Sequence, residues 1–213
     1  DIQAFIDNYK NIDESVEKSN AKFIDKEYKP VEEWIESKIK DIQLFNDYKL
    51  WNNERYISNN DRPDLINEYE KLASDVEEVI HKLDYFNYDN CPYRPELVEF
   101  IKNFHDIDET IRKANEKWIE ENISEIRSFN SYNIRDNKEY ITSKDKIDIK
   151  EEYENVADSV QSLLTDDINS YSNYKNEFIK FITNFINFHD TIKKANEIFI
   201  KNEYEPEEDF FEF

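Results

Sequence analysis

The strongest constraint on the fold of this chain is a block of sequence that occurs three times. The copies span residues 5–24, 100–119 and 181–200, and they align without a gap. Phe and Ile open every copy, and Asn recurs in its fourth and sixteenth positions. Such agreement indicates that a module was duplicated, and stacked modules usually build a surface or spacer rather than a catalytic pocket. The opening aromatic residues are Phe5, Phe100 and Phe181, and the later amides are Asn20, Asn115 and Asn196.

Within the block, apolar residues recur at the spacing of one helix face. In the second copy they are Ile107, Ile111, Ala114 and Trp118, separated by four, three and four residues. The other two copies keep the same spacing, with Ser19 in place of the alanine in the first. This period predicts an amphipathic helix whose apolar face packs against another element.

A polar residue precedes each of these helices. Asn11, Asp106 and Asn187 are residue types that favour the N-cap position, and an acidic residue follows three positions later. This arrangement predicts a capping box, with the acid also favoured by the helix dipole. Because a short amphipathic segment precedes each cap, every block is predicted to be a helix–corner–helix joint.

The duplication extends beyond the block. Residues 66–76 align with 150–160, so that Tyr69 matches Tyr153 and Ala73 matches Ala157. These stretches predict two more long helices, at about 64–83 and about 148–163.

The sequence after the block contains proline in two of the three copies. Pro30 and Pro206 occupy equivalent places after the first and third copies, where each suits the first turn of a new helix or a kink. The second copy has no proline there and is predicted to run on to about Phe129.

Three stretches rich in Asn, Asp and Pro break the helical pattern, at 59–63, 87–95 and 130–145. With the repeat spacing, they predict an all-α fold of tandem helical modules that form an elongated bundle or a short solenoid. We assign residues 1–95 and 96–179 to two modules and residues 180–213 to the start of a truncated third. The chain also lacks Met, and both features lead us to expect a piece of a longer protein.

Composition supports a folded, helical protein. The chain has no Gly, which excludes P-loops, GxGxxG turns and glycine-dependent hairpins. A net charge of −22 alone would suggest disorder, but 15 Phe, 14 Tyr and 3 Trp can supply an apolar core.

The acidic balance also bears on partners and location. It argues against direct nucleic-acid binding, so a partner is expected to be a protein with a basic surface or an adjacent domain; alternatively the charge only maintains solubility. Cys91 is the sole cysteine, which excludes an intrachain disulfide and fits a reducing, cytoplasmic location. The sequence has neither an apolar run of about 18 residues nor the pattern of a signal peptide, so no membrane association is expected.

No residues suggest catalysis, a cofactor or a metal. His81, His105 and His189 do not share a position in the repeat, so we favour ordinary polar roles over zinc binding. The many acids are interpreted as solvated helix faces. The amides Asn20, Asn115 and Asn196 are predicted to bond the backbone of the joint's corner, with ligand contact as the alternative.

The acidic, aromatic end of the chain is a candidate partner-binding segment, or the start of a helix whose packing partner lies beyond Phe213; we favour the second reading. The candidate residues are Glu207, Glu208, Asp209, Phe210 and Phe211.

Together, the Asn/Asp-Ile-Asp-Glu corner, the following helix and the acidic, Phe-rich end resemble a known family. They are similar to the helical segment that precedes the motor in UvrD/Rep-like superfamily 1 DNA helicases of the helicase IV type. In that family the segment leads into a glutamine motif and a Walker A loop. This chain carries neither, so no ATP-binding residue is transferred, and its tandem copies depart from the single segment of the family. The matching residues are Asn11, Ile12, Asp13, Glu14, Asn20, Phe23 and Ile24; Asp106, Ile107, Asp108, Glu109, Asn115, Trp118 and Ile119; Asn196, Phe199 and Ile200; and Asp209, Phe210 and Phe211.

The sequence therefore predicts a non-catalytic, acidic accessory region that positions or regulates a neighbour, which the resemblance implies is a helicase-like ATPase. The alternative is a free-standing acidic interaction protein, such as a DNA mimic that binds the basic cleft of a nucleic-acid enzyme. An enzyme in its own right ranks third.

Overall fold

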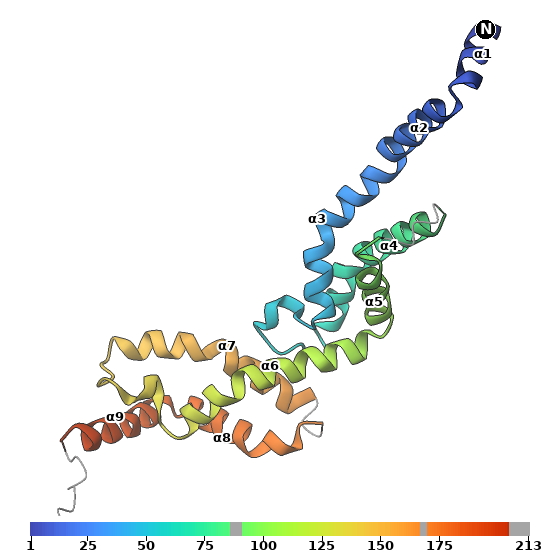
Figure 1. The fold of residues 1–213 in the computed structure, drawn as a ribbon. Helices are drawn as coiled ribbons and strands as arrows, with labels where there is room; N and C mark the ends of the chain where they lie inside the picture. Colours follow the sequence, from blue (N-terminus) through green and yellow to red (C-terminus); the bar gives the residue numbers. More distant parts are fainter. Residues whose placement is uncertain (86–90, 167–169, 205–213) are drawn as a thin grey trace, which may run out of the picture. The chain divides into compact units, whose positions relative to one another are not determined.

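The computed structural model describes residues 1–85, 91–166 and 170–204, and its fold is all-α, as predicted (Figure 1). Within those ranges the regular structure consists of α-helices, short 3₁₀ turns and one π-helical turn, with no strand. The absence of Gly accounts for part of this result, because the tight hairpin turns of small sheets depend on it.

Contacts divide the chain into two compact units. Unit 1 combines Asp1–Asp47 with Glu68–Ile107, and unit 2 combines Tyr48–Asn67 with Asp108–Phe213. The division does not follow the sequence repeat, because the segment Tyr48–Asn67 packs with residues that come after Asp108.

Unit 1 is built around α3 (Lys29–Asn46), α5 (Arg94–His105) and the larger part of α4 (Arg62–Tyr85). It also contains α1 (Ile2–Lys10), α2 (Ile12–Phe23) and a π-helical turn, Ile24–Tyr28. Pro30 lies in the first turn of α3, where its missing N–H breaks no helical hydrogen bond.

Unit 2 contains α6 (Ile107–Asn130), α7 (Asp145–Asp166), α8 (Lys175–Ile186) and α9 (Phe188–Tyr204). Short 3₁₀ turns lie at Leu50–Asn53, Ile134–Asn137 and Ser172–Tyr174. Helix α6 runs unbroken to Asn130, as the absence of proline predicted. The fully buried core side chains of unit 2 include Ile126, Phe129, Ile149, Val160, Leu163, Phe178, Phe181 and Ile192.

A matching trio of aromatic rings packs together in each unit. In unit 1, the ring of Phe45 lies 4.6 Å from that of Tyr69 and 4.8 Å from that of Phe100. In unit 2, the ring of Phe129 lies 4.6 Å from that of Tyr153 and 5.1 Å from that of Phe181. Equivalent residues of the aligned sequences thus make equivalent contacts, and tilted or edge-on geometry is the favoured one for aromatic pairs.

Two turns adopt left-handed backbone conformations without any glycine. Residues with positive φ are Tyr48, Trp51, Asn52, Asn53, Tyr132, Arg135, Asp136 and Asn137. The last four are the aligned counterparts of the first four. A left-handed conformation costs a residue with a Cβ roughly 1–2 kcal/mol, so surrounding contacts must hold both turns in place.

The first copy of the block differs from this pattern, and here the predicted apolar face is not packed. Phe5 is 70% exposed, whereas its counterparts Phe100 and Phe181 are fully buried. Ile12 and Val16 are also about half exposed on α2. The period of the sequence sets which residues share a face, but burial requires a second element, and the described residues leave this face uncovered.

The helix corners lie where the sequence placed them, but the capping box at Asn11 is wrong. One residue, Asn11, separates α1 from α2, and its side chain makes no cap hydrogen bond. Its backbone N–H instead donates to the carbonyl of Asp7 at 3.2 Å. At the third corner, the amide of Asn187 donates to the carbonyl of Thr183 at 2.9 Å. Because a single residue separates the two helices, it can donate to the unpaired carbonyls at the end of the preceding helix instead of capping the next one. Asp106 occupies the second corner, and its N–H donates to Lys102 at 3.0 Å.

Truncating the buried ring of one copy should therefore cost far more than truncating its exposed counterpart. We expect Phe181→Ala to lower the free energy of unfolding by about 3–5 kcal/mol, through lost burial and the cavity left behind. Phe5→Ala should change it by less than about 1 kcal/mol. Urea unfolding followed by circular dichroism measures both, and equal losses would contradict the exposure of α1.

Candidate functional site

Asn115 on α6 makes a buried polar contact through both ends of its side-chain amide. Its side-chain Oδ1 accepts a hydrogen bond from the N–H of Ile57 at 2.8 Å, and its Nδ2 donates to the C=O of Ile57 at 3.0 Å. Only 4% of Asn115 is exposed. The side chain thus pairs both backbone groups of one residue in the loop before α4, and we call this contact the amide clamp.

The amide clamp occurs again at the aligned position. The Oδ1 of Asn196 accepts from the N–H of Ile141 at 2.8 Å, and its Nδ2 donates to the C=O of Ile141 at 2.9 Å. The predicted target of these amides was wrong: they hold a loop that lies more than fifty residues earlier in the chain, not the backbone of the corner. The Asn lies more than two helical turns beyond the corner, so its side chain faces the covering loop.

Asn20, in the first copy, clamps no loop among the residues that the structure describes. Its side chain is exposed on α2. The three predicted amides are therefore not equivalent, since two are clamps and one faces solvent.

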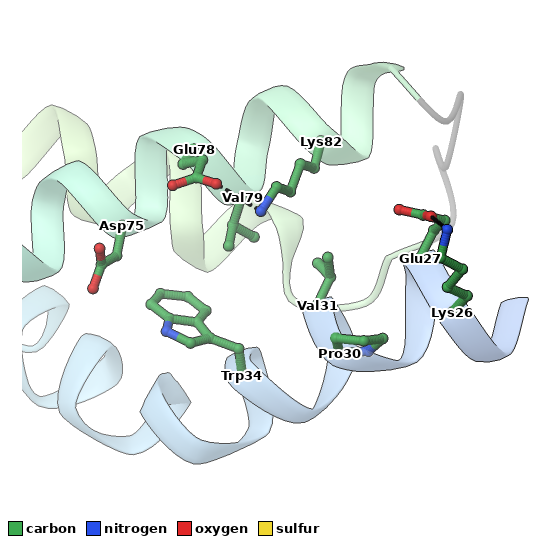
Figure 2. Close-up of a pocket in the computed structure, with 9 residues that line it drawn as sticks. All are labelled: Lys26, Glu27, Pro30, Val31, Trp34, Asp75, Glu78, Val79 and Lys82. Atoms are coloured by element: carbon green, nitrogen blue, oxygen red, sulfur yellow. Dashed lines mark ion pairs between the residues drawn. The ribbon is translucent and has the colours of Figure 1, made fainter. Parts of the chain in front are cut away.

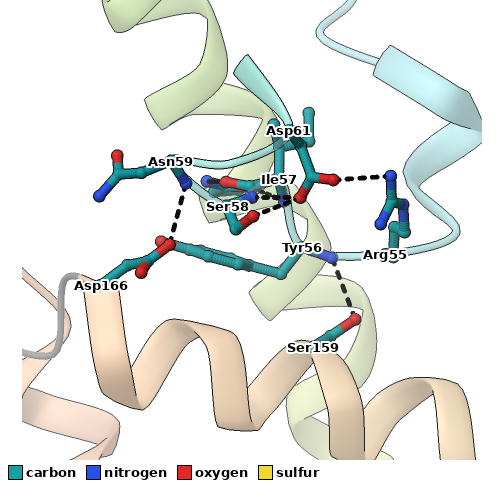
Figure 3. A network of polar contacts seen from close by, with 9 residues as sticks. Arg55, Tyr56, Ile57, Ser58, Asn59, Asp61, Ser159 and Asp166 are labelled. Carbon is teal, nitrogen blue, oxygen red and sulfur yellow. Dashed lines mark hydrogen bonds and ion pairs between the residues drawn. The ribbon is translucent and has the colours of Figure 1, made fainter. Parts of the chain in front are cut away.

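A polar network fixes the first clamped loop (Figure 3). The hydroxyl and the backbone N–H of Ser58 donate to the carboxylate of Asp61, at 2.5 Å and 2.9 Å, and Arg55 pairs with the same carboxylate at 2.9 Å. The N–H of Tyr56 donates to the hydroxyl of Ser159 on α7 at 3.2 Å. The N–H of Asn59 donates to Asp166 at 2.9 Å, so the loop is tied to α7 both at Ser159 and at the last residue of the helix.

The Ser58–Asp61 contact has a counterpart that the sequence reading missed. The hydroxyl and backbone N–H of Thr142 donate to Asp145, at 2.6 Å and 2.8 Å. Both pairs form caps at the starts of α4 and α7, in the pattern Ser/Thr-x-x-Asp. That pattern is visible in the sequence at 58–61 and 142–145, and could have been found there.

These contacts shift the acidity of both carboxyl groups. Partial burial raises the pKa of Asp61, but the hydrogen bonds from Ser58 and the charge of Arg55 outweigh it, so the pKa is lowered. The hydrogen bonds from Thr142 likewise lower the pKa of Asp145. Both side chains are held as carboxylates near neutral pH.

A second pair of polar contacts is made by the lysines that lie two residues before each clamping asparagine. Lys113 donates to the hydroxyl of Tyr48 at 3.0 Å, and its ammonium lies 4.8 Å from the centre of that ring. Lys194 donates to the hydroxyl of Tyr132 at 3.1 Å, again with the ammonium 4.8 Å from the ring centre. A cation over an aromatic face adds to the hydrogen bond, so each lysine secures a tyrosine of the left-handed turn.

Amide side chains join the helix ends in the same repeated way. Asn46 donates to the carbonyl of Glu96 at 2.9 Å, and Asn130 donates to the carbonyl of Glu177 at 2.8 Å. Each of these residues also accepts a hydrogen bond, from Asn103 at 3.2 Å and from Asn184 at 3.3 Å respectively.

Beside the first clamp lies a pocket of about 280 Å³, within unit 2. Its charged lining is internally paired: Arg62 bonds Asp108 at 2.6 Å, and Arg112 bonds Glu109 at 2.7 Å. These ion pairs and the clamp occupy the polar groups of Arg62, Arg112 and Asn115 that could otherwise bind a ligand. We therefore interpret the pocket as a gap left where the loop packs on α6.

Unit 1 has a groove of about 410 Å³ between the start of α3 and the end of α4 (Figure 2). Trp34, Val31 and Val79 form its apolar part. Along its edge, Lys82 pairs with Glu78 at 2.6 Å. The groove is open and amphipathic, which suits contact with a protein surface better than enclosure of a small molecule.

The remaining predicted positions show no reactive arrangement in the part of the chain that the structure describes. No group of three or more His, Cys, Asp or Glu side chains there could hold a metal ion. His105 lies 3.4 Å from Glu77, with both side chains exposed, and Cys91 is buried. Burial raises the pKa of Tyr69 to about 12, with Glu68 and Asp41 adding to the shift, so the phenol stays neutral in the core. Glu207, Glu208, Asp209, Phe210 and Phe211 lie outside the described residues, as does Pro206.

Comparison with protein-family models, curated proteins and solved structures finds no match for this chain. Among the described helices, none is both long enough and apolar enough to cross a membrane.

The clamp makes a direct prediction for stability. Asn115→Leu should lower the free energy of unfolding by about 1–3 kcal/mol, because it leaves the N–H and C=O of Ile57 buried without partners. Asn20→Leu is the matched control and should leave the unfolding midpoint unchanged, since Asn20 is exposed. Denaturant unfolding of the two variants measures the difference, and an unaltered midpoint for Asn115→Leu would refute the clamp.

The cap at Asp61 makes a prediction for pH dependence. Its pKa in the folded chain lies below the ordinary value of 3.8, so its stabilising effect is present above that pH and is lost as the pH falls through the folded-state pKa. We expect Asp61→Asn to melt at a lower temperature than the unmodified chain at pH 7. The gap should narrow as the pH falls below 3.8 and the carboxylate becomes protonated in the folded chain. A gap that stays constant with pH would show that the charge of Asp61 has no part in the cap.

Proposed function

We propose that this chain is a non-catalytic, acidic helical region that binds and positions a neighbouring domain or partner protein. The observation that carries the proposal is an exposed apolar surface on α1, on α2 and on the first residue of the π-helical turn that follows α2. Exposed large apolar side chains that are grouped on one surface commonly mark interaction sites. We call this surface the α1–α2 face, and it consists of Ile2, Phe5, Ile6, Tyr9, Ile12, Val16, Phe23 and Ile24, each between 38% and 81% exposed.

The polar chemistry of the chain supports a structural role. The buried amides of Asn115 and Asn196 bond loop backbone, and the carboxylates of Asp61 and Asp145 accept hydrogen bonds in helix caps. A catalytic site instead directs such groups toward an open space where a substrate can bind. The four polar side chains named here instead contact the backbone of the protein itself.

Charge defines the partner further. The net charge is −22, and acidic side chains flank the α1–α2 face, among them Asp7, Asp13 and Glu17. A complementary partner would present an apolar strip bordered by Lys and Arg. Nucleic acid lacks both properties, so direct binding is not part of the proposal. In keeping with the sequence resemblance, we propose that the neighbour is the ATP-driven motor of a helicase.

The reading frame beyond Phe213 provides the first test. We expect it to encode a glutamine motif and a Walker A loop. A stop codon directly after Phe213 would overturn the proposal of a helicase-associated region and favour a free-standing acidic interaction protein.

The role of the α1–α2 face is tested in the parent protein. Phe5→Glu combined with Ile12→Glu should change its DNA-stimulated ATPase rate several-fold, because the charges prevent docking of the face. Ile147→Glu is the matched control, since Ile147 is 62% exposed on α7 and lies outside the face. ATPase rates unaffected by the double substitution would contradict a regulatory or positioning role for the face.

A further inference from the structure

The α1–α2 face has two counterparts in the same chain, and both are covered. Ile2 is 81% exposed, whereas its counterparts Leu97 and Phe178 are fully buried. The difference at Phe5 is equally large. The second and third copies of the block therefore show what kind of segment covers such a face.

In unit 2 the cover is the end of α6, the following turn and loop, and α7. The rings of Phe129 and Tyr153 lie 5.1 Å and 6.2 Å from that of Phe181. Farther along, the hydroxyl of Tyr132 accepts from Lys194, and the backbone of Ile141 is clamped by Asn196.

The equivalent residues around the second copy repeat each of these contacts. The rings of Phe45 and Tyr69 lie 4.8 Å and 6.5 Å from that of Phe100. Tyr48 accepts from Lys113, and Ile57 is clamped by Asn115. We call the stretches 45–73 and 129–157 covering segments.

The covering segments share a spaced motif. Both begin with Phe-Asn-x-Tyr, at 45–48 and 129–132, and both continue with Tyr-Ile-Ser/Thr-x-x-Asp, at 56–61 and 140–145. A helix then follows that carries Tyr and Ala on one face, at Tyr69 and Ala73 in the first segment.

The α1–α2 face carries the complementary residues at the same spacing, and they lie open. Phe5 aligns with Phe100 and Phe181, each of which packs against two aromatic rings. Asn20 aligns with the clamping residues Asn115 and Asn196. Lys18 aligns with the two lysines that bond tyrosine, but it pairs with Glu14 at 2.6 Å, with both side chains largely exposed.

We infer that the α1–α2 face binds a third covering segment: a helix–loop–helix with the Phe-Asn-x-Tyr and Tyr-Ile-Ser/Thr-x-x-Asp motif. Its Ile backbone is clamped by Asn20, its first Tyr is bonded by Lys18, and its aromatic residues enclose Phe5. Both covering segments of this chain are already engaged, so a second copy of the chain does not supply the occupant. The inference rests on the binding role proposed above and identifies the part of the partner that binds.

The test adds such a segment to the intact chain. Residues 107–176 are copied in front of Asp1, in the register in which they precede Glu177, the residue that aligns with Asp1. Amide hydrogen exchange in α1 and α2 is then expected to slow by on the order of tenfold or more. In this extended chain Asn20→Leu should reverse much of the protection, while the same substitution in the original chain should change nothing.

Three results would overturn the inference. One is unchanged exchange in α1 and α2 of the extended chain. Another is equal protection by an extension in which the copied Phe129 and Tyr153 are both replaced by Glu, which would show that the added segment does not use the motif. The last is a concentration-dependent dimer of the original chain that Phe5→Glu dissociates, which would make the face a self-interface. The failure of this inference is separable from that of the proposed function, because the ATPase rate of the double variant with Phe5→Glu and Ile12→Glu, compared with that of Ile147→Glu, measures docking of any partner.

Discussion

The amide clamp is the interaction on which the rest of the structure depends. A single Asn side chain has one acceptor and one donor, and at Asn115 and Asn196 both serve one loop residue. Without it, the buried N–H and C=O of Ile57 or Ile141 would lose hydrogen-bonding partners, which costs more than an average hydrogen bond contributes. The clamp thus joins a loop to a helix residue that follows it by more than fifty positions in the chain.

The two left-handed turns show why several contacts are needed to hold each loop in place. A chain without Gly must place residues such as Tyr48 and Tyr132 at positive φ, which is unfavourable for a side chain with a Cβ. The lysine contacts to both tyrosines and the complete burial of Leu50 and near-complete burial of Ile134 hold these turns in place. Strain of this kind often accompanies function, but here it recurs at aligned positions and serves the packing of loops.

The same design explains why the molecule has an open face. Each helix–corner–helix joint presents rings, a lysine and an amide to a covering segment, and two of the three joints are covered. The first joint keeps the residues of the design but exposes them, which gives an acidic protein an apolar surface suited to a defined partner. Binding there does not require new chemistry, since the chain already contains two examples of the contact.

Local patterns in the sequence determined the helices, the one-residue corners, the unbroken course of α6 and the faces that carry Phe100 and Phe181. These follow from helical period, proline and residue type within a few positions. Only the tertiary structure decided that Asn115 pairs with Ile57, that the turns are left-handed, and that Phe5 is exposed while its counterparts are buried. The physical reason is that burial and hydrogen bonding depend on a second segment, and periodicity along one helix does not specify which distant segment covers it.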